Sequence, residues 1–263
     1  MKKYVLDLTV RRVEPLSSKH VLIRLTHAEP LPEMLPGQFA ELRIDGSSSA
    51  FLRRPISIHY VDREQNELWL MVAMVGDGTR WLGTLKEGDL LNCVLPLGNS
   101  FTMPATAGPA TSADDARYLL IGGGVGVAPL LFLGAQLKSR GVTPTFLLGG
   151  RSRADLLELE EFAKYGDVYV TTEDGSMGEQ GFVTNHSVLA GTFDRICTCG
   201  PTPMMKAVAR YAKERGICCE ASLENLMACG LGACLCCVEK TTDGHLCVCQ
   251  EGPVFDVDRL LWD

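Results

Sequence analysis

Cysteine is the residue type with the most evident chemistry in this sequence. The chain has 263 residues and 11 cysteines. Eight of the cysteines lie after residue 217, at Cys218, Cys219, Cys229, Cys234, Cys236, Cys237, Cys247 and Cys249. Charged residues interrupt the first apolar run, MKKYVLDLTVRRVEP, before it reaches the length of an export signal. Disulfides are rare in proteins that are not exported, so we expect a cytoplasmic protein whose cysteines bind metal or take part in redox chemistry.

Three of these cysteines form one closely spaced group. Cys229, Cys234 and Cys237 follow the pattern C-x4-C-x2-C, which is the spacing of the loop that binds the [2Fe-2S] cluster in plant-type ferredoxins. A structural zinc site or a loop of free thiols would be the alternatives, but zinc sites more often use two C-x2-C pairs. We expect most other cysteines to behave as small buried apolar residues, namely Cys93, Cys197, Cys199, Cys218, Cys219 and Cys236.

The same loop contains residues suited to wrapping around a cluster. Gly230 and Gly232 allow positive φ angles and a close approach of the backbone. Backbone amides turned inward by such a loop would stabilise anionic sulfur. A cluster of this kind needs a fourth ligand, and Cys247 and Cys249 are both candidates. Residues two apart in a strand face the same side, so periodicity leaves this choice open.

Two loops in the second half of the chain suit a nucleotide. The segment GGGVGVAP at 122–129 follows an expected strand and precedes an expected helix, where glycines let the backbone approach a pyrophosphate at the helix N-terminus. The segment TCGPTPM at 198–204 forms a second turn of this kind, and two such turns at one sheet edge make a crevice. A tight turn without a ligand is the alternative for the first loop. The candidate residues are Gly122, Gly123, Gly124, Gly126, Cys199, Gly200 and Pro201.

Two further segments in the first hundred residues could contact phosphate. In RRPIS, at 53–57, an arginine can neutralise a phosphate and a serine hydroxyl can reach a ring heteroatom. In GDGT, at 76–79, backbone amides and the Thr79 hydroxyl could supply a second contact. Taken alone, each segment is also compatible with an ordinary turn.

The spacing of apolar and turn residues divides the chain into parts. Short β-rich runs are expected at 4–10, 20–25, 38–44, 56–61, 68–75 and 90–95, which favours a small β-barrel or sandwich. After Phe101 a stretch rich in small and polar residues resembles a linker. Strands at 118–121, 145–148, 168–172 and 195–198 then alternate with helices at 129–140, 155–165 and 203–214, which predicts a parallel sheet.

We therefore expect a β-barrel domain at 1–104, an α/β parallel-sheet domain at 114–220 and a small C-terminal cysteine-bearing unit at 221–263. The net charge of −7 and the pI of about 5.3 argue against nucleic acid as a partner. The uncharged stretch 118–137 has the length of a membrane span. Its glycines and proline favour strand, loop and helix, so we expect no membrane span.

Together the motifs resemble a known family. An Arg-Pro-x-Ser strand, a Gly-x-Gly-Thr turn, a GGGVGVAPL loop and a Cys-Gly-Pro turn, in this order, are similar to ferredoxin-reductase-like flavin and pyridine-nucleotide oxidoreductases. SLENLMACGLGACLCCVE at 222–239 and CQEGPVF at 249–255 resemble the electron-transfer subunits of class 1B, NAD-dependent dihydroorotate dehydrogenases. The resemblance extends over nearly the whole chain.

This resemblance implies a role for each matching position. The first domain would bind FAD through Arg54, Pro55, Ile56, Ser57, Met71, Val72, Ala73, Gly78 and Thr79. The second would bind NAD(H) at the two loops named above. Cys229, Cys234, Cys237 and Cys249 would hold the [2Fe-2S] cluster, with Cys249 preferred because it directly precedes QEGPVF. Arg151 and Arg153 could serve a 2′-phosphate, but the resemblance favours NADH over NADPH.

The three implied cofactors, NAD(H), FAD and the [2Fe-2S] cluster, fit together chemically. A nicotinamide gives up two electrons as hydride whereas a cluster accepts one, so a flavin must stand between them. The resemblance implies an FMN-containing dihydroorotate dehydrogenase catalytic subunit as partner, in a heterotetramer of two plus two subunits acting in pyrimidine biosynthesis. The alternatives are a related subunit of a sulfide dehydrogenase, a ferredoxin:NADP oxidoreductase or a hydrogenase, and a zinc-stabilised module without turnover. The apolar residues around the cysteines would pack on the flavin domain or meet the partner: Met227, Ala228, Leu231, Ala233 and Leu235.

Overall fold

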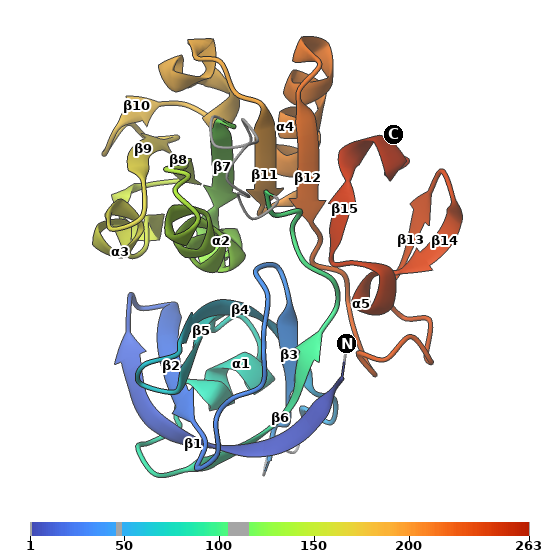
Figure 1. The fold of residues 1–263 in the computed structure, drawn as a ribbon. Coiled ribbons are helices and arrows are strands. Elements are labelled where there is room, and N and C mark those ends of the chain that lie inside the picture. The colour runs from blue at the N-terminus through green and yellow to red at the C-terminus, as the bar shows by residue number, and fades with distance from the viewer. Residues whose placement is uncertain (1, 46–48, 105–115, 263) are drawn as a thin grey trace.

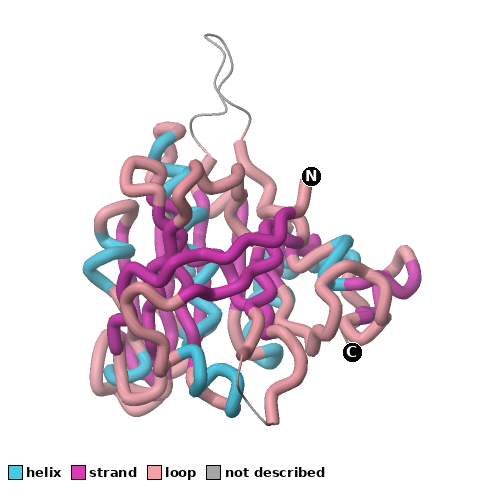
Figure 2. Tube along the Cα trace, turned by 90° about the horizontal axis from the view of Figure 1, so that it is seen from below, coloured by secondary structure: helices cyan, strands magenta, loops and turns pink. Residues whose placement is uncertain are grey.

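A computed structural model describes residues 2–45, 49–104 and 116–262 of the chain. It contains a barrel, a sheet flanked by helices, and a small C-terminal part that lies beside both (Figure 1). In the perpendicular view this C-terminal part still lies to one side of the other two (Figure 2). Most of the predicted linker, and the predicted domain start at residue 114, lie outside the described residues.

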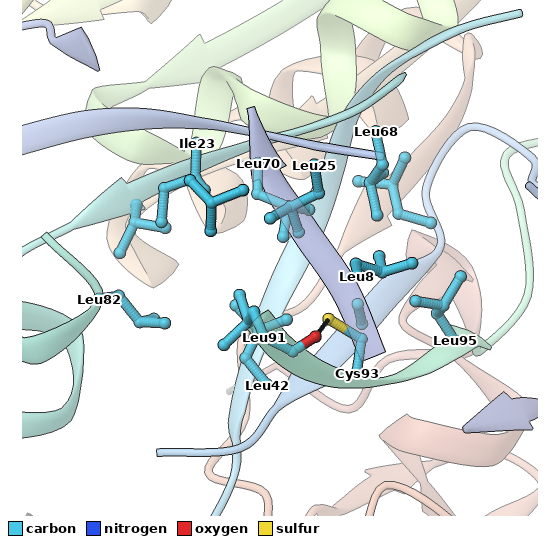
Figure 3. Packing of buried hydrophobic residues seen from close by; sticks show 14 of the residues in the cluster. Leu8, Ile23, Leu25, Leu42, Leu68, Leu70, Leu82, Leu91, Cys93 and Leu95 are labelled. Atoms are coloured by element: carbon cyan, nitrogen blue, oxygen red, sulfur yellow. Dashed lines mark hydrogen bonds between the residues drawn. The ribbon is translucent and has the colours of Figure 1, made fainter. Parts of the chain in front are cut away.

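The N-terminal half forms a closed antiparallel barrel with the strand order β1-β2-β5-β4-β3-β6. This confirms the expected series of short strands. The bounds are β1 Tyr4–Pro15, β2 His20–Thr26, β3 Phe39–Leu42, β4 Arg54–Asp62, β5 Glu67–Ala73 and β6 Leu90–Leu97, with the short helix α1 at Asp77–Leu82. Alternate side chains point inward, and leucines fill the interior (Figure 3). Cys93 is part of this core, and its thiol donates a hydrogen bond to the carbonyl oxygen of Leu91 at 3.4 Å.

The second half forms a sheet with the strand order β10-β9-β8-β7-β11-β12-β15. All neighbouring pairs are parallel except β12 with β15. The strands are β7 Tyr118–Gly123, β8 Thr145–Gly150, β9 Asp167–Thr172, β10 Glu179–Gln180, β11 Arg195–Cys199, β12 Cys218–Ser222 and β15 Val254–Asp256. The α-helices of this part are α2 Ala128–Ser139, α3 Leu159–Ala163 and α4 Thr202–Arg215. Side chains of α2 and α3 pack on one face of the sheet and those of α4 on the other.

The uncharged stretch 118–137 is divided between β7, a 3-10 turn at Gly124–Val127 and α2. The prediction of strand, loop and helix is therefore correct. Among the described residues, none of the helices has both the length and the apolar character needed to cross a membrane.

The helix predicted at 155–165 is wrong over its first half. The segment contains the end of a 3-10 turn, Arg153–Asp155, and then the short helix α3. Glu158 precedes α3 with φ of +52°, a left-handed conformation that does not continue a helix. The sequence prediction also missed β10 and β12.

His59 explains the irregular backbone at Glu158 and joins the barrel to the sheet domain. The side chain is fully buried on β4. Its Nδ1 is 2.8 Å from the carbonyl oxygen of Ala128, at the start of α2, and its Nε2 is 2.7 Å from Oε2 of Glu158. One imidazole thus holds two segments of the sheet domain against the barrel.

The C-terminal part consists of the hairpin β13 Val238–Thr241 and β14 Gly244–Cys247, the helical turn α5 Val248–Glu251, and β15. Its apolar core includes Cys237, Val248 and Cys249 and is completed by residues of other elements, among them Phe39 of β3 and Leu97 of β6. Asn99 adds two hydrogen bonds to this contact. Its Nδ2 donates to the carbonyl oxygens of Glu251 and Val254 at 2.9 and 2.8 Å.

We predict that His59→Ala lowers the free energy of unfolding by about 2–3 kcal/mol, because it leaves the buried groups on Ala128 and Glu158 without their partner. Chemical denaturation followed by circular dichroism measures this loss. His27→Ala is the control, since the described hydrogen bonds of the His27 side chain stay within its own loop, at Glu29. Equal stability of the two variants would show that the His59 contacts contribute nothing net.

Candidate functional site

Four thiols come together as two pairs beside the barrel. Cys234 influences the pKa of Cys229, and Cys237 influences that of Cys249, so the thiols of each pair lie close together. The backbone N–H of Cys249 also donates to Sγ of Cys237 at 3.4 Å. Cys237 and Cys249 are buried and Cys234 is exposed, so the group runs from the interior to the surface.

Backbone amides of the loop point at these sulfurs. The N–H of Leu231 donates to Sγ of Cys229 at 3.3 Å, and the N–H of Gly232 donates to Sγ of Cys249 at 3.2 Å. Hydrogen bonds from the amides of Leu231 and Cys234 lower the pKa of the Cys229 thiol to about 6. Gly230 and Gly232 have φ of +65° and +79°, as expected for a loop that wraps tightly.

The environments of Cys247 and Cys249 differ. The expectation that both lie on one strand is wrong, because β14 ends at Cys247 and α5 begins at Val248. The turn carries Cys249 inward, where it is 1% exposed and contacts the loop through the Gly232 amide. Burial raises its pKa to about 12, and the hydrogen bond to Cys237 acts in the same direction. Cys247 is only partly buried. This geometry favours Cys249 as the fourth ligand.

The thiol arrangement fits a two-iron cluster better than a single ion. Each iron of a [2Fe-2S] cluster with four cysteine ligands takes two thiolates, and the chain offers two pairs. Two predictions for the other cysteines are wrong, because Cys218 and Cys236 are exposed rather than buried.

The residues predicted to bind a flavin lie where the pairing of β4 with β5 ends, and this place is named the flavin gap. The register between β4 and β5 runs from Asp62 and Glu67 to Ile58 and Leu70 and stops there. Beyond that point 54–57 pair with β3 and 71–73 pair with β2, so the two segments diverge. Arg54, Pro55, Ile56 and Ser57 are all partly exposed. The side chain of Val72 is fully buried in the barrel core, so only its backbone can face a ligand.

Arg54 lies against the turn at the start of α1. A Cβ added to Gly78 would be 2.7 Å from Nε of Arg54, so this glycine makes room for the guanidinium. Thr79 closes the turn, because its Oγ1 accepts from the N–H of Gly76 at 3.0 Å. The neighbouring Arg53 hydrogen-bonds within the barrel instead. Its guanidinium donates to the carbonyl oxygens of Glu41 and Asn92. Of the two arginines, Arg54 is therefore the one whose guanidinium is placed to contact a phosphate.

The two glycine loops meet at the carboxyl ends of the neighbouring strands β7 and β11. A Cβ added to Gly126 would be 2.4 Å from Cα of Gly200, so the two backbones are in contact. Gly122 and Gly123 are close to side chains of the domain itself, whereas Gly124, with φ of +57°, has open space beside it. The 3-10 turn that contains Gly124 also lies against β5. The flavin gap and the nucleotide loops are thus neighbours.

Two buried side chains bear on this region, and the burial of the first was not predicted. Glu41 on β3 is fully buried, and its burial raises the pKa of the carboxyl to about 7 although the charge of Arg53 opposes the shift. A lone acidic residue in the apolar run QFAEL was the only sequence signal. Cys199 is also fully buried, so the turn at 199–201 offers backbone more than thiol to a ligand.

Part of the cysteine loop is an exposed apolar surface. Leu231 and Leu235 are 49% and 65% exposed, and Leu226 nearby is 85% exposed. Met227 packs on the core of the C-terminal part instead. The packing expectation therefore holds for Met227, whereas contact of the exposed leucines with a partner stays a prediction.

Comparisons with known proteins agree with this geometry. Residues 224–261 match the family model described as the iron-sulfur cluster binding domain of dihydroorotate dehydrogenase B, and residues 120–210 match the oxidoreductase NAD-binding domain. A Fusobacterium nucleatum protein named dihydroorotate dehydrogenase B (NAD(+)), electron transfer subunit, is 39% identical over 227 residues, 84% of each chain. A Lysinibacillus sphaericus protein of the same name is 41% identical over 237 residues, 87% of this chain and 88% of that one. The chain belongs to the family of dihydroorotate dehydrogenase B electron-transfer subunits.

Solved structures place this dihydroorotate dehydrogenase B family member among ferredoxin-reductase-like folds. An NADH-dependent reduced ferredoxin-NADP oxidoreductase, studied for flavin-based electron bifurcation, is 28% identical with a TM-score of 0.84, covering 97% of this chain and 90% of that one. An Amycolatopsis cytochrome P450 reductase is also 28% identical, with a TM-score of 0.67, covering 81% and 66%.

For this family member we predict that Cys249→Ser loses or alters the EPR signal of a reduced cluster, because Cys249 is the buried thiol that contacts the loop. Cys247→Ser, the matched control two residues away, keeps the signal. Iron content and EPR of the reduced proteins measure both effects. The reverse pattern would make Cys247 the fourth ligand.

We also predict that Gly126→Ala weakens NADH binding at least about tenfold, because its Cβ would force the Gly126 and Gly200 backbones apart. Fluorescence titration with NADH measures the change. Flavin and iron contents serve as internal controls, since Gly126 lies outside both of those sites. Unchanged NADH affinity would show that the contact between the loops is not needed for the nucleotide.

Proposed function

We propose that this chain is the electron-transfer subunit of a dihydroorotate dehydrogenase. It would pass electrons between NAD(H) and the FMN of a separate catalytic subunit that interconverts dihydroorotate and orotate in pyrimidine biosynthesis. The observation that carries the proposal is the gathering of four thiols near loop amides beside a barrel face, in a chain that also brings two glycine loops into contact. The family names of the relatives support the same activity.

The proposed domain roles follow the order of the chain. Residues 1–104 would bind FAD, 114–220 would bind NAD(H), and 221–263 would bind the [2Fe-2S] cluster. A flavin supplies the conversion between the two-electron chemistry of a nicotinamide and the one-electron chemistry of a cluster. The candidate residues of each domain would bind or orient one of these groups.

In the barrel, Arg54 would neutralise flavin phosphate, supported by the space that Gly78 leaves around its guanidinium. Thr79 and the backbone of the α1 turn would complete the phosphate contact. Pro55, Ile56 and Ser57 would line one side of the gap, and Met71, Val72 and Ala73 the other.

In the sheet domain, the open side of Gly124 would receive the pyrophosphate, near the N-terminus of α2. Gly122, Gly123 and Gly126 permit the close packing of strand, helix and loop that shapes this position. Cys199, Gly200 and Pro201 would border the nicotinamide end.

In the C-terminal part, Cys229 and Cys234 would hold one iron and Cys237 and Cys249 the other. The amides of Leu231 and Gly232 would stabilise the thiolate sulfurs. The exposed side chains of Leu231 and Leu235 would contact the catalytic subunit, because electron transfer requires close approach and an exposed apolar surface suits a protein interface. We further propose a cytoplasmic heterotetramer of two plus two subunits. All 11 cysteines are free, which suits a reducing compartment.

Activity of the reconstituted complex tests the function. The chain, purified without oxygen, should carry FAD and iron, show flavin and iron-sulfur absorption that bleaches with NADH, and co-purify with an FMN-containing partner that forms orotate in an NAD-linked reaction. A colourless protein containing zinc would exclude electron transfer. An active flavin and iron-sulfur protein that reduces ferredoxin but supports no orotate formation would favour the second candidate, a ferredoxin:NADP oxidoreductase subunit, to which the likeness with the solved oxidoreductase points.

A further inference from the structure

Glu41 lies on the outer face of the barrel between the two proposed cofactor sites. Its neighbours Ala40 and Leu42 point into the barrel core, so the alternation along β3 turns Glu41 outward. The strand order places β3 between β6, on which the C-terminal part packs, and β4, which borders the flavin gap. Despite facing outward, Glu41 is fully buried.

The cysteine loop is what covers Glu41. A Cβ added to Gly230 would be 2.8 Å from Cγ and 3.2 Å from Oε1 of Glu41. The glycine next to Cys229 therefore allows the loop to rest directly on this carboxyl. Any larger side chain at that position would hold the loop away from the barrel.

The carboxyl has no partner of its own. Among the described residues, neither oxygen of Glu41 has a hydrogen-bond partner. The two nearby arginines are directed elsewhere: Arg53 donates to carbonyl oxygens and to Asn92, and Arg54 donates to Leu52 and lies against Gly78. Burying a carboxyl without a partner costs several kcal/mol. Such a group is retained at functional sites more readily than in an ordinary core.

We propose that Glu41 is an electrostatic tuning residue whose carboxylate lowers the reduction potential of the cluster held by the cysteine loop. Reduction adds negative charge to a cluster, and a fixed negative charge in a low-dielectric setting opposes that addition. The electron then leaves the cluster more readily toward the next acceptor. The proposal rests on the proposed function, since it requires a cluster at the four thiols.

Redox titration of the full-length holoprotein tests this role, with the reduced-cluster EPR signal as readout. Potentials are measured at alkaline pH, which favours the charged form of the carboxyl. Glu41→Gln keeps the shape and removes the charge, so its midpoint potential should move to a more positive value. Glu41→Asp keeps the charge and should stay near the wild type. Glu14→Gln removes a carboxylate from β1, paired there with Arg24, and should cause no shift.

Two results would overturn the proposal: a Glu41→Gln potential equal to the wild type, or an equal shift in Glu41→Asp, which would indicate packing in place of charge. If Glu41→Gln does not retain its cluster, Glu41→Met offers a second uncharged side chain of similar length with the same expected shift. A wild-type chain without a reduced-cluster signal would instead contradict the proposed function. The two failures are therefore distinguishable.

Discussion

The packing of the C-terminal part on the outer face of the barrel is the contact on which the whole site depends. A segment of this size cannot bury a sufficient core alone, and here Phe39 and Leu97 of the barrel complete its interior around Cys237 and Cys249. The apolar contact therefore positions the two buried thiols, and amides of the loop donate to Cys229 and Cys249. Cluster binding would add to this stability, since metal ligation and folding are coupled in small metal-binding units.

The arrangement also explains why the three sites are neighbours. His59 holds α2 and the Glu158 turn on β4, which brings the turn at 124–127 against β5. The glycine loops can then approach the flavin gap, while the cysteine loop rests on β3, the strand next to β4. The distance between redox groups is thus set by contacts between domains, because each group would be held within its own domain.

Local patterns predicted much of the fold and of the site. The C-x4-C-x2-C spacing, the glycine loops and the alternating strands all depend on residues close in sequence, and their elements are found where the patterns indicate. The features that sequence could not reveal depend on distant partners. The left-handed Glu158 shortens a predicted helix because it contacts His59, 99 residues away. Cys247 and Cys249 are equivalent by periodicity until the turn at Val248 separates them. The burial of Glu41 arises only when Gly230 is placed on it.

The pairing of β15 with β12 has a consequence for how the chain assembles during synthesis. β12 would be an edge strand of the parallel sheet if residues 254–256 were absent, with a row of unpaired backbone groups open to other chains. The barrel and most of the sheet precede the C-terminal part in sequence, so they can fold first while this edge and the apolar barrel face stay uncovered. When the C-terminal part folds, it covers both the edge of β12 and the apolar face of the barrel. In the folded protein β15 thus covers a strand edge at which other chains could otherwise pair.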